Sequence, residues 1–268
     1  MSTEATCLFG TAGWSYKDWD GTIYPSKKPA GFNHLKFLAE EKAMQFVEVN
    51  TSFYHIPSPK LTSSWVQKTE GLTGFTFWMK LHQQFTHQRK VIPADVLAFT
   101  AALEPLQQAG KLSGLLAQFP YSFKLNTGNL NYTLALATLF QAYPLALEFR
   151  HQSWNRQEFF ALLKEKNLIW VNIDQPQVSL SLPLTATMTH REISYVRLHG
   201  RNEANWFADN GRDARYDYDY KALDLDQIMH KIKELAALAK TIFVSGNNHY
   251  KGNAVKNLLE LKKKLQLE

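Results

Sequence analysis

Five short segments of the sequence alternate apolar residues with polar or charged ones. In residues 46–50, Glu48 and Asn50 alternate with Val47 and Val49. Because successive side chains of a β-strand point to opposite faces, each segment would have one apolar face and one polar face. Lys, Glu and Arg side chains are rarely buried without a partner, so the polar faces are expected to meet in a shared polar space. The other four segments are residues 77–82, 145–150, 168–174 and 195–200.

Helical patterns separate most of the strand-like segments, of which there are eight in all. The exception is residues 175–190, where Pro176, Pro183 and many Ser and Thr residues predict an irregular crossover. The predicted strands are residues 8–13, 46–54, 75–82, 113–119, 145–151, 168–174, 193–200 and 241–247. The predicted helices are residues 32–43, 61–69, 94–109, 130–142, 156–166, 225–239 and 254–265, several with Asn129, Asn155, Asp224 or Asn253 as the expected N-cap.

This order of elements predicts the fold class. Strands that alternate with helices favour a parallel sheet with right-handed crossovers. Eight such repeats in 268 residues match the count and the usual length of a closed barrel. We therefore predict an α/β fold, a (β/α)8 TIM-like barrel that forms a single domain over residues 1–268.

The composition limits the compartment and the partners. The one cysteine, Cys7, permits no intramolecular disulfide, which favours a reducing cytoplasm. The sequence has no secretion-signal pattern at its start and no uninterrupted apolar stretch of about 18 residues, so we expect no membrane association. A net charge of +6 favours anionic partners, either a small molecule or nucleic acid. Nothing in the sequence indicates an oligomeric state.

The polar faces of the strands are predicted to point into the barrel. The outward faces pack against helices and must be apolar, which leaves the polar residues inside, near the carboxyl-terminal strand ends where barrel active sites form. The predicted ring consists of Glu48, Asn50, Lys80, His82, Gln118, Glu148, Arg150, Asn172, Asp174, Arg197, His199 and Asn247.

Four residues of this ring are candidate catalytic residues: Glu48, Glu148, His199 and Lys80. Either glutamate could act as general acid or base, because partial desolvation moves the pKa of a carboxyl group toward neutrality. His199 is either a further acid–base group or an orienting hydrogen-bond donor.

The cations of the ring favour an anionic ligand. Lys80, Arg150 and Arg197 would hold a phosphate or a carboxylate. One alternative is a buried ionic belt in which the charges only satisfy one another. Another is a metal site made of Glu48, Glu148, Asp174, His82 and His199. The neighbouring cations would repel a divalent ion, and no H-E-x-x-H motif is present, so we predict neither a metal nor another cofactor.

Aromatic residues form a third group, in or beside the segments that follow strands. The aromatic residues predicted to stack on a base or a sugar ring of the ligand are Trp14, Tyr16, Phe53, Tyr54, Trp154, Tyr216 and Tyr218. Trp19 and Trp206 fit better as packing residues of a lid, and Arg212 and Arg215 in a predicted closing loop are possible anion contacts.

The junction after the last strand, residues 245–253, is a possible phosphate site. Barrels often bind phosphate there, with backbone N–H groups of a helix N-terminus. Gly252 and Asn253 suit that geometry, and Asn247, Asn248 and Gly252 are predicted to contact the ligand. The alternative is an ordinary turn in which Asn253 caps the following helix.

A series of sequence fragments extends in order along nearly the whole chain. The fragments are residues 10–16 with Asp18, Trp19, Tyr24 and Pro25, then 48–54, 117–120, 146–151 with Ser153 and Trp154, 196–200, 216–218, and 247–249 with Gly252. Together they resemble the YecE-like family, known as domain of unknown function 72. The resemblance implies a TIM barrel distantly akin to xylose-isomerase-like and endonuclease-like barrels, and it implies no particular activity.

These features predict an enzyme that binds a phosphorylated sugar or a nucleotide-like anion at the barrel mouth for acid–base hydrolysis or isomerisation. The alternative is a non-catalytic protein that binds nucleic acid across the same face. Dinucleotide, P-loop and serine-hydrolase motifs are absent from the sequence.

Overall fold

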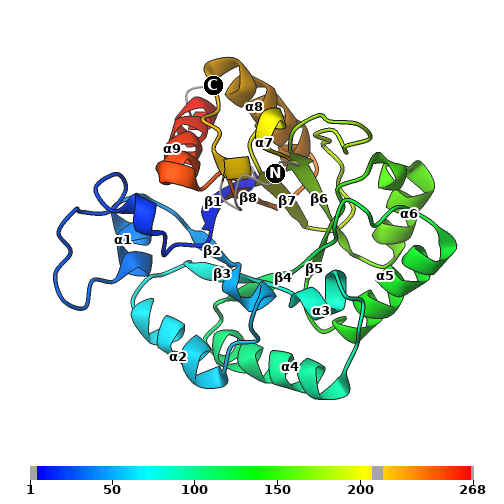
Figure 1. Ribbon diagram of the computed structural model, residues 1–268, viewed down its shortest axis with the longest axis horizontal. Coiled ribbons are helices and arrows are strands. Elements are labelled where there is room, and N and C mark those ends of the chain that lie inside the picture. The colour runs from blue at the N-terminus through cyan, green and yellow to red at the C-terminus, as the bar shows by residue number, and fades with distance from the viewer. Residues whose placement is uncertain (1–4, 207–213, 267–268) are drawn as a thin grey trace.

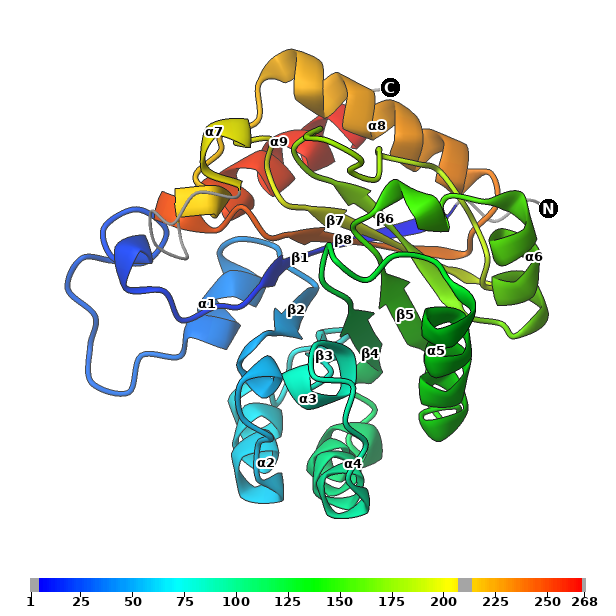
Figure 2. The same ribbon diagram turned by 45° about the vertical axis from the view of Figure 1, so that its right-hand side comes forward.

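The computed structural model of the protein describes residues 5–206 and 214–266. Eight parallel strands close into a barrel in chain order, with helices around the outside (Figures 1 and 2). Pairing of the last strand with the first completes the barrel. The strands are β1 (Thr6–Ala12), β2 (Phe46–Val49), β3 (Thr76–Lys80), β4 (Leu112–Gln118), β5 (Leu145–Glu148), β6 (Ile169–Asp174), β7 (Ile193–Leu198) and β8 (Thr241–Gly246). The predicted (β/α)8 TIM-like fold is confirmed.

The helices follow the predicted order. The longer ones are α1 (His34–Glu40), α2 (Pro59–Lys68), α4 (Pro93–Gln108), α5 (Thr127–Leu139), α6 (Gln157–Glu165), α8 (Ala222–Ala236) and α9 (Asn253–Gln266). Two further helices, α3 (Gln83–Thr86) and α7 (Glu203–Trp206), lie in segments that follow β3 and β7. Among the described residues, no helix combines the length and the apolar character needed to cross a membrane.

Several predicted boundaries were wrong. The strands β2 and β5 end earlier than predicted, because short 3-10 turns, Thr51–Phe53 and Gln152–Trp154, follow them. The N-cap of α5 is Asn126, whose side chain accepts a hydrogen bond from the backbone N–H of Asn129. The N-caps of α6 and α8 are Arg156 and Lys221 rather than Asn155 and Asp224, and Asn253 is the first residue of α9.

The crossover between β6 and β7 has no helix, as predicted. The side chain of Asn172 on β6 accepts hydrogen bonds of 2.8 Å from Thr185 Oγ1 and from the backbone N–H of Thr187. Asn172 therefore faces outward and pairs with hydrogen-bond donors of the irregular crossover. Its predicted place in the inward ring was wrong. A crossover without a helix leaves backbone groups unpaired, and a polar residue on the outer face of the strand replaces the missing helical hydrogen bonds.

An aromatic cluster fills the barrel interior below the mouth. Trp78 lies 4.6 Å from Tyr195 and 5.2 Å from Phe243, measured between ring centroids, and all three are buried. Gly114 makes room for Trp78, since a Cβ at this position would lie 2.6 Å from the indole ring and 2.7 Å from the carbonyl oxygen of Pro144. This aromatic cluster therefore fills the part of the barrel that lies beneath the polar residues of the mouth.

We expect Gly114→Ala to lower the free energy of unfolding by about 1–3 kcal/mol, because the added methyl group must displace Trp78 or a backbone carbonyl. Gly128→Ala is the matched control, since its Cβ would meet nothing closer than 3.5 Å on the exposed side of α5. There alanine should be neutral or stabilising. Urea denaturation of both variants measures the difference, and an equal effect at the two positions would contradict the packing argument.

Candidate functional site

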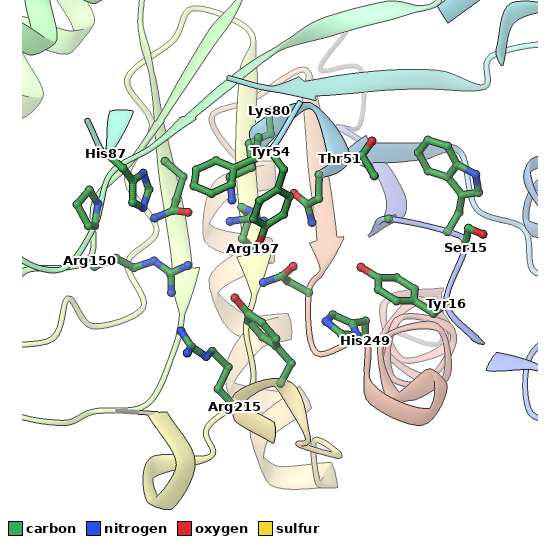
Figure 3. A pocket seen from close by; sticks show the side chains of 18 of the residues that line it. Ser15, Tyr16, Thr51, Tyr54, Lys80, His87, Arg150, Arg197, Arg215 and His249 are labelled. Carbon is green, nitrogen blue, oxygen red and sulfur yellow. The ribbon is translucent and has the colours of Figure 1, made fainter. Parts of the chain in front are cut away.

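A cavity of about 750 Å³ opens at the carboxyl-terminal mouth of the barrel (Figure 3). It is bounded by the segments that follow most of the strands, which is where sequence analysis placed the site. The predicted site residues that line it include Trp14, Tyr16, Asn50, Phe53, Tyr54, Lys80, Gln118, Arg150, Arg197, Tyr216 and Asn247.

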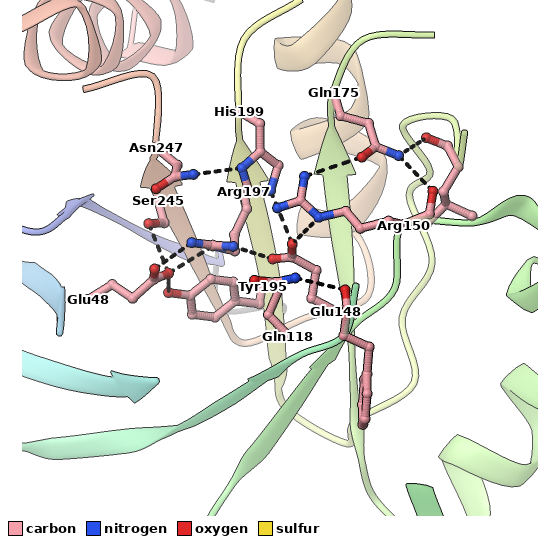
Figure 4. Close-up of polar contacts among 12 residues, drawn as sticks. Glu48, Gln118, Glu148, Arg150, Gln175, Tyr195, Arg197, His199, Ser245 and Asn247 are labelled. Carbon is pink, nitrogen blue, oxygen red and sulfur yellow. Dashed lines mark hydrogen bonds and ion pairs between the residues drawn. The ribbon is translucent and has the colours of Figure 1, made fainter. Parts of the chain in front are cut away.

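The floor of the cavity is a buried ionic layer centred on Arg197 (Figure 4). Its guanidinium group donates to both carboxylate oxygens of Glu48, at 2.9 and 2.5 Å, and to Glu148 on the other side. The hydroxyl of Tyr195 donates to Glu48 at 3.0 Å and that of Ser245 at 3.3 Å. Arg197 thus joins two glutamates from opposite parts of the chain, and both carboxylates are buried under it.

A second arginine completes the layer. Arg150 Nε lies 2.7 Å from Glu148 Oε1, and its Nη1 donates to the side-chain oxygen of Gln175 at 3.3 Å. Nε2 of His199 lies 3.3 Å from the same Glu148 oxygen, and the other ring nitrogen of His199 is 2.8 Å from the side-chain amide of Asn247. The carboxylate of Glu148 is therefore surrounded by two guanidinium groups and one imidazole.

These contacts determine the ionisation of the layer. Burial opposes ionisation of Glu148, but Arg150 and Arg197 outweigh burial and hold its pKa well below the usual range. Burial, followed by the charge of Arg150, lowers the pKa of His199 to about 3. Glu148 is therefore ionised and His199 neutral near pH 7. The predicted shift of this glutamate toward neutrality was wrong, because its cationic neighbours stabilise the charged form more than desolvation disfavours it.

Lys80, at the end of β3, has a different environment. Its ammonium group lines the cavity and lies 4.4 Å from the centroid of the Phe53 ring. Among the described residues, no carboxylate forms an ion pair with it, since Glu48 and Glu148 are engaged by the arginines. Burial and then the charge of Arg197 lower the pKa of Lys80 to about 7. A lysine at the cavity surface is thus partly neutral at physiological pH.

The charged groups that line the cavity all have the same sign. They are Lys80, Arg150, Arg197 and Arg215, and no Asp or Glu occurs among the described lining residues. The Nε atom of Arg215 is buried without a hydrogen-bond partner within the described part of the chain. Arg212, the other predicted anion contact of this segment, lies outside the described residues. Arg150 and Arg197 are paired with Glu48 and Glu148 beneath the wall, so among the described residues the uncompensated positive charge at the wall comes from Arg215 and from the protonated form of Lys80.

Aromatic side chains form the opposite part of the wall. In Figure 3, Tyr16 and His249 lie on one side of the cavity and Arg150 with His87 on the other. Tyr16 stacks on His249 with ring centroids 4.2 Å apart, and Trp14 packs edge-on against Trp65 at 5.6 Å. Such surfaces suit the face of a planar ring or of a sugar.

Two predicted ligand contacts have structural roles instead. His82 caps α3: its Nδ1 accepts from the backbone N–H of Gln84, and its Nε2 lies 3.2 Å from the carbonyl oxygen of Tyr54. Trp154 is completely buried, stacks on Phe149 at 4.1 Å and donates its indole N–H to a backbone carbonyl. Neither side chain lines the cavity.

Asp174 and Tyr218 also lie outside the cavity wall. Asp174 is paired with Arg201 at 2.9 Å and accepts a hydrogen bond of 2.6 Å from the hydroxyl of Tyr220. Tyr218 donates to Asp224 at 3.0 Å. Like Asn172, Asp174 lies on the outer face of β6. The assumption that the polar residues of every strand point inward therefore failed on this strand.

The predicted phosphate site after β8 is filled by contacts with other segments of the protein. The side-chain amide of Asn248 donates to the backbone of Tyr218 at 2.9 Å. A Cβ on Gly252 would lie 2.5 Å from Ile23, and the Asp18 carboxylate accepts a hydrogen bond of 2.6 Å from the backbone N–H of Lys251. Gly252 is required for close packing and a positive φ of 83°, and a carboxylate already occupies the turn. Asn248 and Gly252 do not line the cavity.

The two predicted lid aromatics behave differently. Trp19 is buried and donates its indole N–H to the carbonyl oxygen of His249 at 2.7 Å. It therefore holds the backbone of a lining residue in place and does not line the cavity itself. Trp206 lines the cavity, with the guanidinium of Arg150 5.4 Å from its ring.

Sequence analysis missed His87, Trp65 and His249 as lining residues. Trp65 lies on α2, and His87 follows the short helix α3. Neither lies directly after a strand, so the alternation that identified the other residues contains no signal for these two. His249 was noted only as part of a family fragment. Among the described residues, no three His, Cys, Asp or Glu side chains come together as a possible metal site.

Comparison with known proteins identifies the family. Residues 8–268 match the family model described as "Protein of unknown function DUF72". The chain is 31% identical to the UPF0759 protein YunF of Bacillus subtilis (strain 168), over 97% of this chain and 94% of that protein. A solved DUF72 family protein from Thermotoga maritima has a TM-score of 0.87 and 34% identity, covering 97% of this chain and 99% of that chain.

A solved DUF72 family protein from Enterococcus faecalis has a TM-score of 0.84 and 26% identity, over 98% of this chain and 96% of that chain. All these matches extend over nearly the full length of both partners, and they agree with the YecE-like resemblance of the sequence. The chain therefore belongs to the DUF72 family of proteins of unknown function.

Proposed function

We propose that this protein is an enzyme that binds an anionic small molecule at the barrel mouth and performs acid–base chemistry on it, in a hydrolysis or an isomerisation. The main support is the charge of the cavity wall, where Arg215 and the protonated form of Lys80 have no carboxylate partner among the described residues. Arg150 and Arg197, which are paired with buried glutamates, also line this wall. Uncompensated positive charge in a partly enclosed space raises the local concentration of anions and favours their binding.

The shape of the wall suggests the kind of anion. Arginines can hold a phosphate or a carboxylate through two parallel hydrogen bonds, and the aromatic side opposite them can stack on a ring. A phosphorylated sugar or a nucleotide-like molecule has both features. A cavity of about 750 Å³ is within the range typical of small-molecule sites.

Lys80 is the group best suited to transfer a proton. A general base works best when its pKa lies near the operating pH, and that of Lys80 is lowered to about 7. Glu148 is buried and bonded to arginines, and His199 is buried beneath the wall, so neither has the same access to a ligand. We assign these two residues to positioning Arg150 and Arg197.

Anion binding can be tested with inorganic phosphate and a panel of sugar phosphates and nucleoside monophosphates, by isothermal titration calorimetry. We expect Arg215→Met to weaken binding of the best ligand by about tenfold or more, because a hydrogen bond between charged groups contributes about 1.5–3 kcal/mol. Arg215 is the sharper choice since, among the described residues, no carboxylate pairs with it. Arg156→Met, on an exposed residue that does not line the cavity, is the matched control.

If no anion of the panel binds, or if Arg215→Met and Arg156→Met bind alike, the proposal is wrong. The alternative, a non-catalytic nucleic-acid-binding protein, predicts instead that oligonucleotides bind with a strong salt dependence while the small anions do not. Its structural support is weaker, because Trp154, one of the aromatics expected to stack on bases, is buried in the core.

A further inference from the structure

We propose that Lys80 is a nucleophile which forms a covalent imine with a substrate that carries both a carbonyl group and an anionic group. This inference rests on the proposed function, because it takes the cationic wall as the site of the anionic group. It goes beyond that function by naming a covalent step and a substrate class, an aldehyde or ketone with a carboxylate or phosphate.

The first support is that the ionic layer leaves Lys80 without a carboxylate partner. Glu48 is bonded to Arg197 through both oxygens, and Glu148 is held between Arg197 and Arg150. A lysine amine that forms an ion pair stays protonated and cannot attack a carbonyl. Here two arginines hold the buried glutamates, so the nitrogen of Lys80 remains available at the cavity surface.

The second support is that the position of Lys80 is fixed. It is the last residue of β3, and its backbone carbonyl accepts a hydrogen bond of 2.6 Å from the hydroxyl of Ser52. The same hydroxyl lies 2.8 Å from the carbonyl oxygen of Val49, which joins the ends of the neighbouring strands β2 and β3. Phe53 supports the amino group from one side, with 4.4 Å between Nζ and the ring centroid. A nucleophile on a rigid strand end needs little reorganisation to react.

The third support is electrostatic. Desolvation and a neighbouring cation are the two conditions that activate a lysine as a nucleophile, because both favour the neutral amine. Lys80 meets both, since burial and Arg197 together lower its pKa to about 7. A lowered pKa increases the share of the protein that carries the reactive neutral amine at neutral pH.

The reaction balances without an oxidant or a metal. The Lys80 nitrogen attacks the carbonyl carbon, a C–N bond forms, and the carbonyl oxygen becomes the hydroxyl of a carbinolamine. That hydroxyl then leaves as water, and a C=N bond remains. The water molecule contains the carbonyl oxygen and both hydrogens of the neutral amine. Protonation of this imine draws electrons from the adjacent carbon, which would favour loss of a proton there and so an isomerisation.

Reductive trapping tests the inference. The full-length protein is incubated at pH 7 with sodium cyanoborohydride and either pyruvate, glyceraldehyde 3-phosphate or the uncharged ketone acetone, and peptides are mapped by mass spectrometry. We expect a reduced adduct on Lys80 that forms at least tenfold faster with an anionic carbonyl than with acetone. Lys90→Met, on an exposed residue, should keep this adduct, whereas Lys80→Met and Lys80→Arg should lose it. Lys80→Arg keeps a positive charge and cannot form an imine.

The pH dependence gives a second readout. Labelling of Lys80 should rise to a plateau just above pH 7, while that of exposed lysines keeps rising toward pH 10. If phosphate or a sugar phosphate binds and Lys80 is labelled no faster than the exposed lysines, the covalent step is wrong and the anion site stands. If no anion binds and no Lys80 adduct forms, both proposals fail.

Discussion

Replacing Arg197 by methionine should lower the free energy of unfolding by about 3–5 kcal/mol at pH 7. The side chain is 1% exposed and neutralises two carboxylates that are themselves fully buried. Without it, Glu48 keeps only hydroxyl donors, from Tyr195 and Ser245. An unpaired buried carboxylate costs several kcal/mol, which makes this the largest destabilisation that we expect from a single substitution at the site.

The effect of the unpaired carboxylate in Arg197→Met can be separated from the effect of lost packing. Adding Glu48→Gln to Arg197→Met removes the unpaired charge and should recover part of the loss, whereas Arg191→Met, on an exposed residue, should have little effect. Urea denaturation at pH 7 measures these differences, and a deficit that Glu48→Gln leaves unchanged would refute the charge argument.

Replacing Lys80 by methionine should act in the opposite direction and raise the free energy of unfolding by about 1–3 kcal/mol at pH 7. Burial and then the charge of Arg197 lower the pKa of Lys80 in the folded state from its ordinary value of 10.5 to about 7. Between these values the unfolded chain binds more protons, so the native protein should gain stability as pH rises from about 7 to 10. Lys80→Met should abolish this gain, because the titrating group is gone.

Urea denaturation at pH 7 and pH 9.5 compares the native protein with Lys80→Met, and Lys90→Met is the control on an exposed lysine. A stabilised Lys80→Met that no longer binds or reacts with its ligand would mean that the lysine is retained for function at a cost in stability. A destabilised variant with an unchanged pH profile would show instead that Lys80 contributes to the fold.

Much of the fold was predictable because its signals are local. The alternation of Glu48 and Asn50 with valines, and similar patterns elsewhere, identified strands with an inward polar face and placed the candidate residues at the end of the barrel where the cavity opens. The same rule failed on β6, where Asn172 and Asp174 face outward. Alternation shows that two residues share a face, and only the neighbouring crossover determines which face points inward.

The roles of the site residues were less predictable, because they depend on pairing across long distances in the chain. Glu48 and Arg197 are 149 positions apart, and no local pattern indicates that this arginine engages both glutamates. Of the four candidate catalytic residues, the two glutamates are thus bonded to arginines, and Lys80 has no carboxylate partner among the described residues. His87 and Trp65 were missed for a similar reason, since helices and loops bring them to the wall.

The sequence by itself determined the barrel, the family and the set of polar residues near its mouth, because strand alternation and the order of elements are encoded over a few residues at a time. Only the tertiary structure decided which charges neutralise one another. In a barrel floor closed to water, the energy of each ionised group depends on its nearest neighbours. Arg197 pairs with the glutamates, and Lys80 therefore faces the cavity without a carboxylate partner among the described residues.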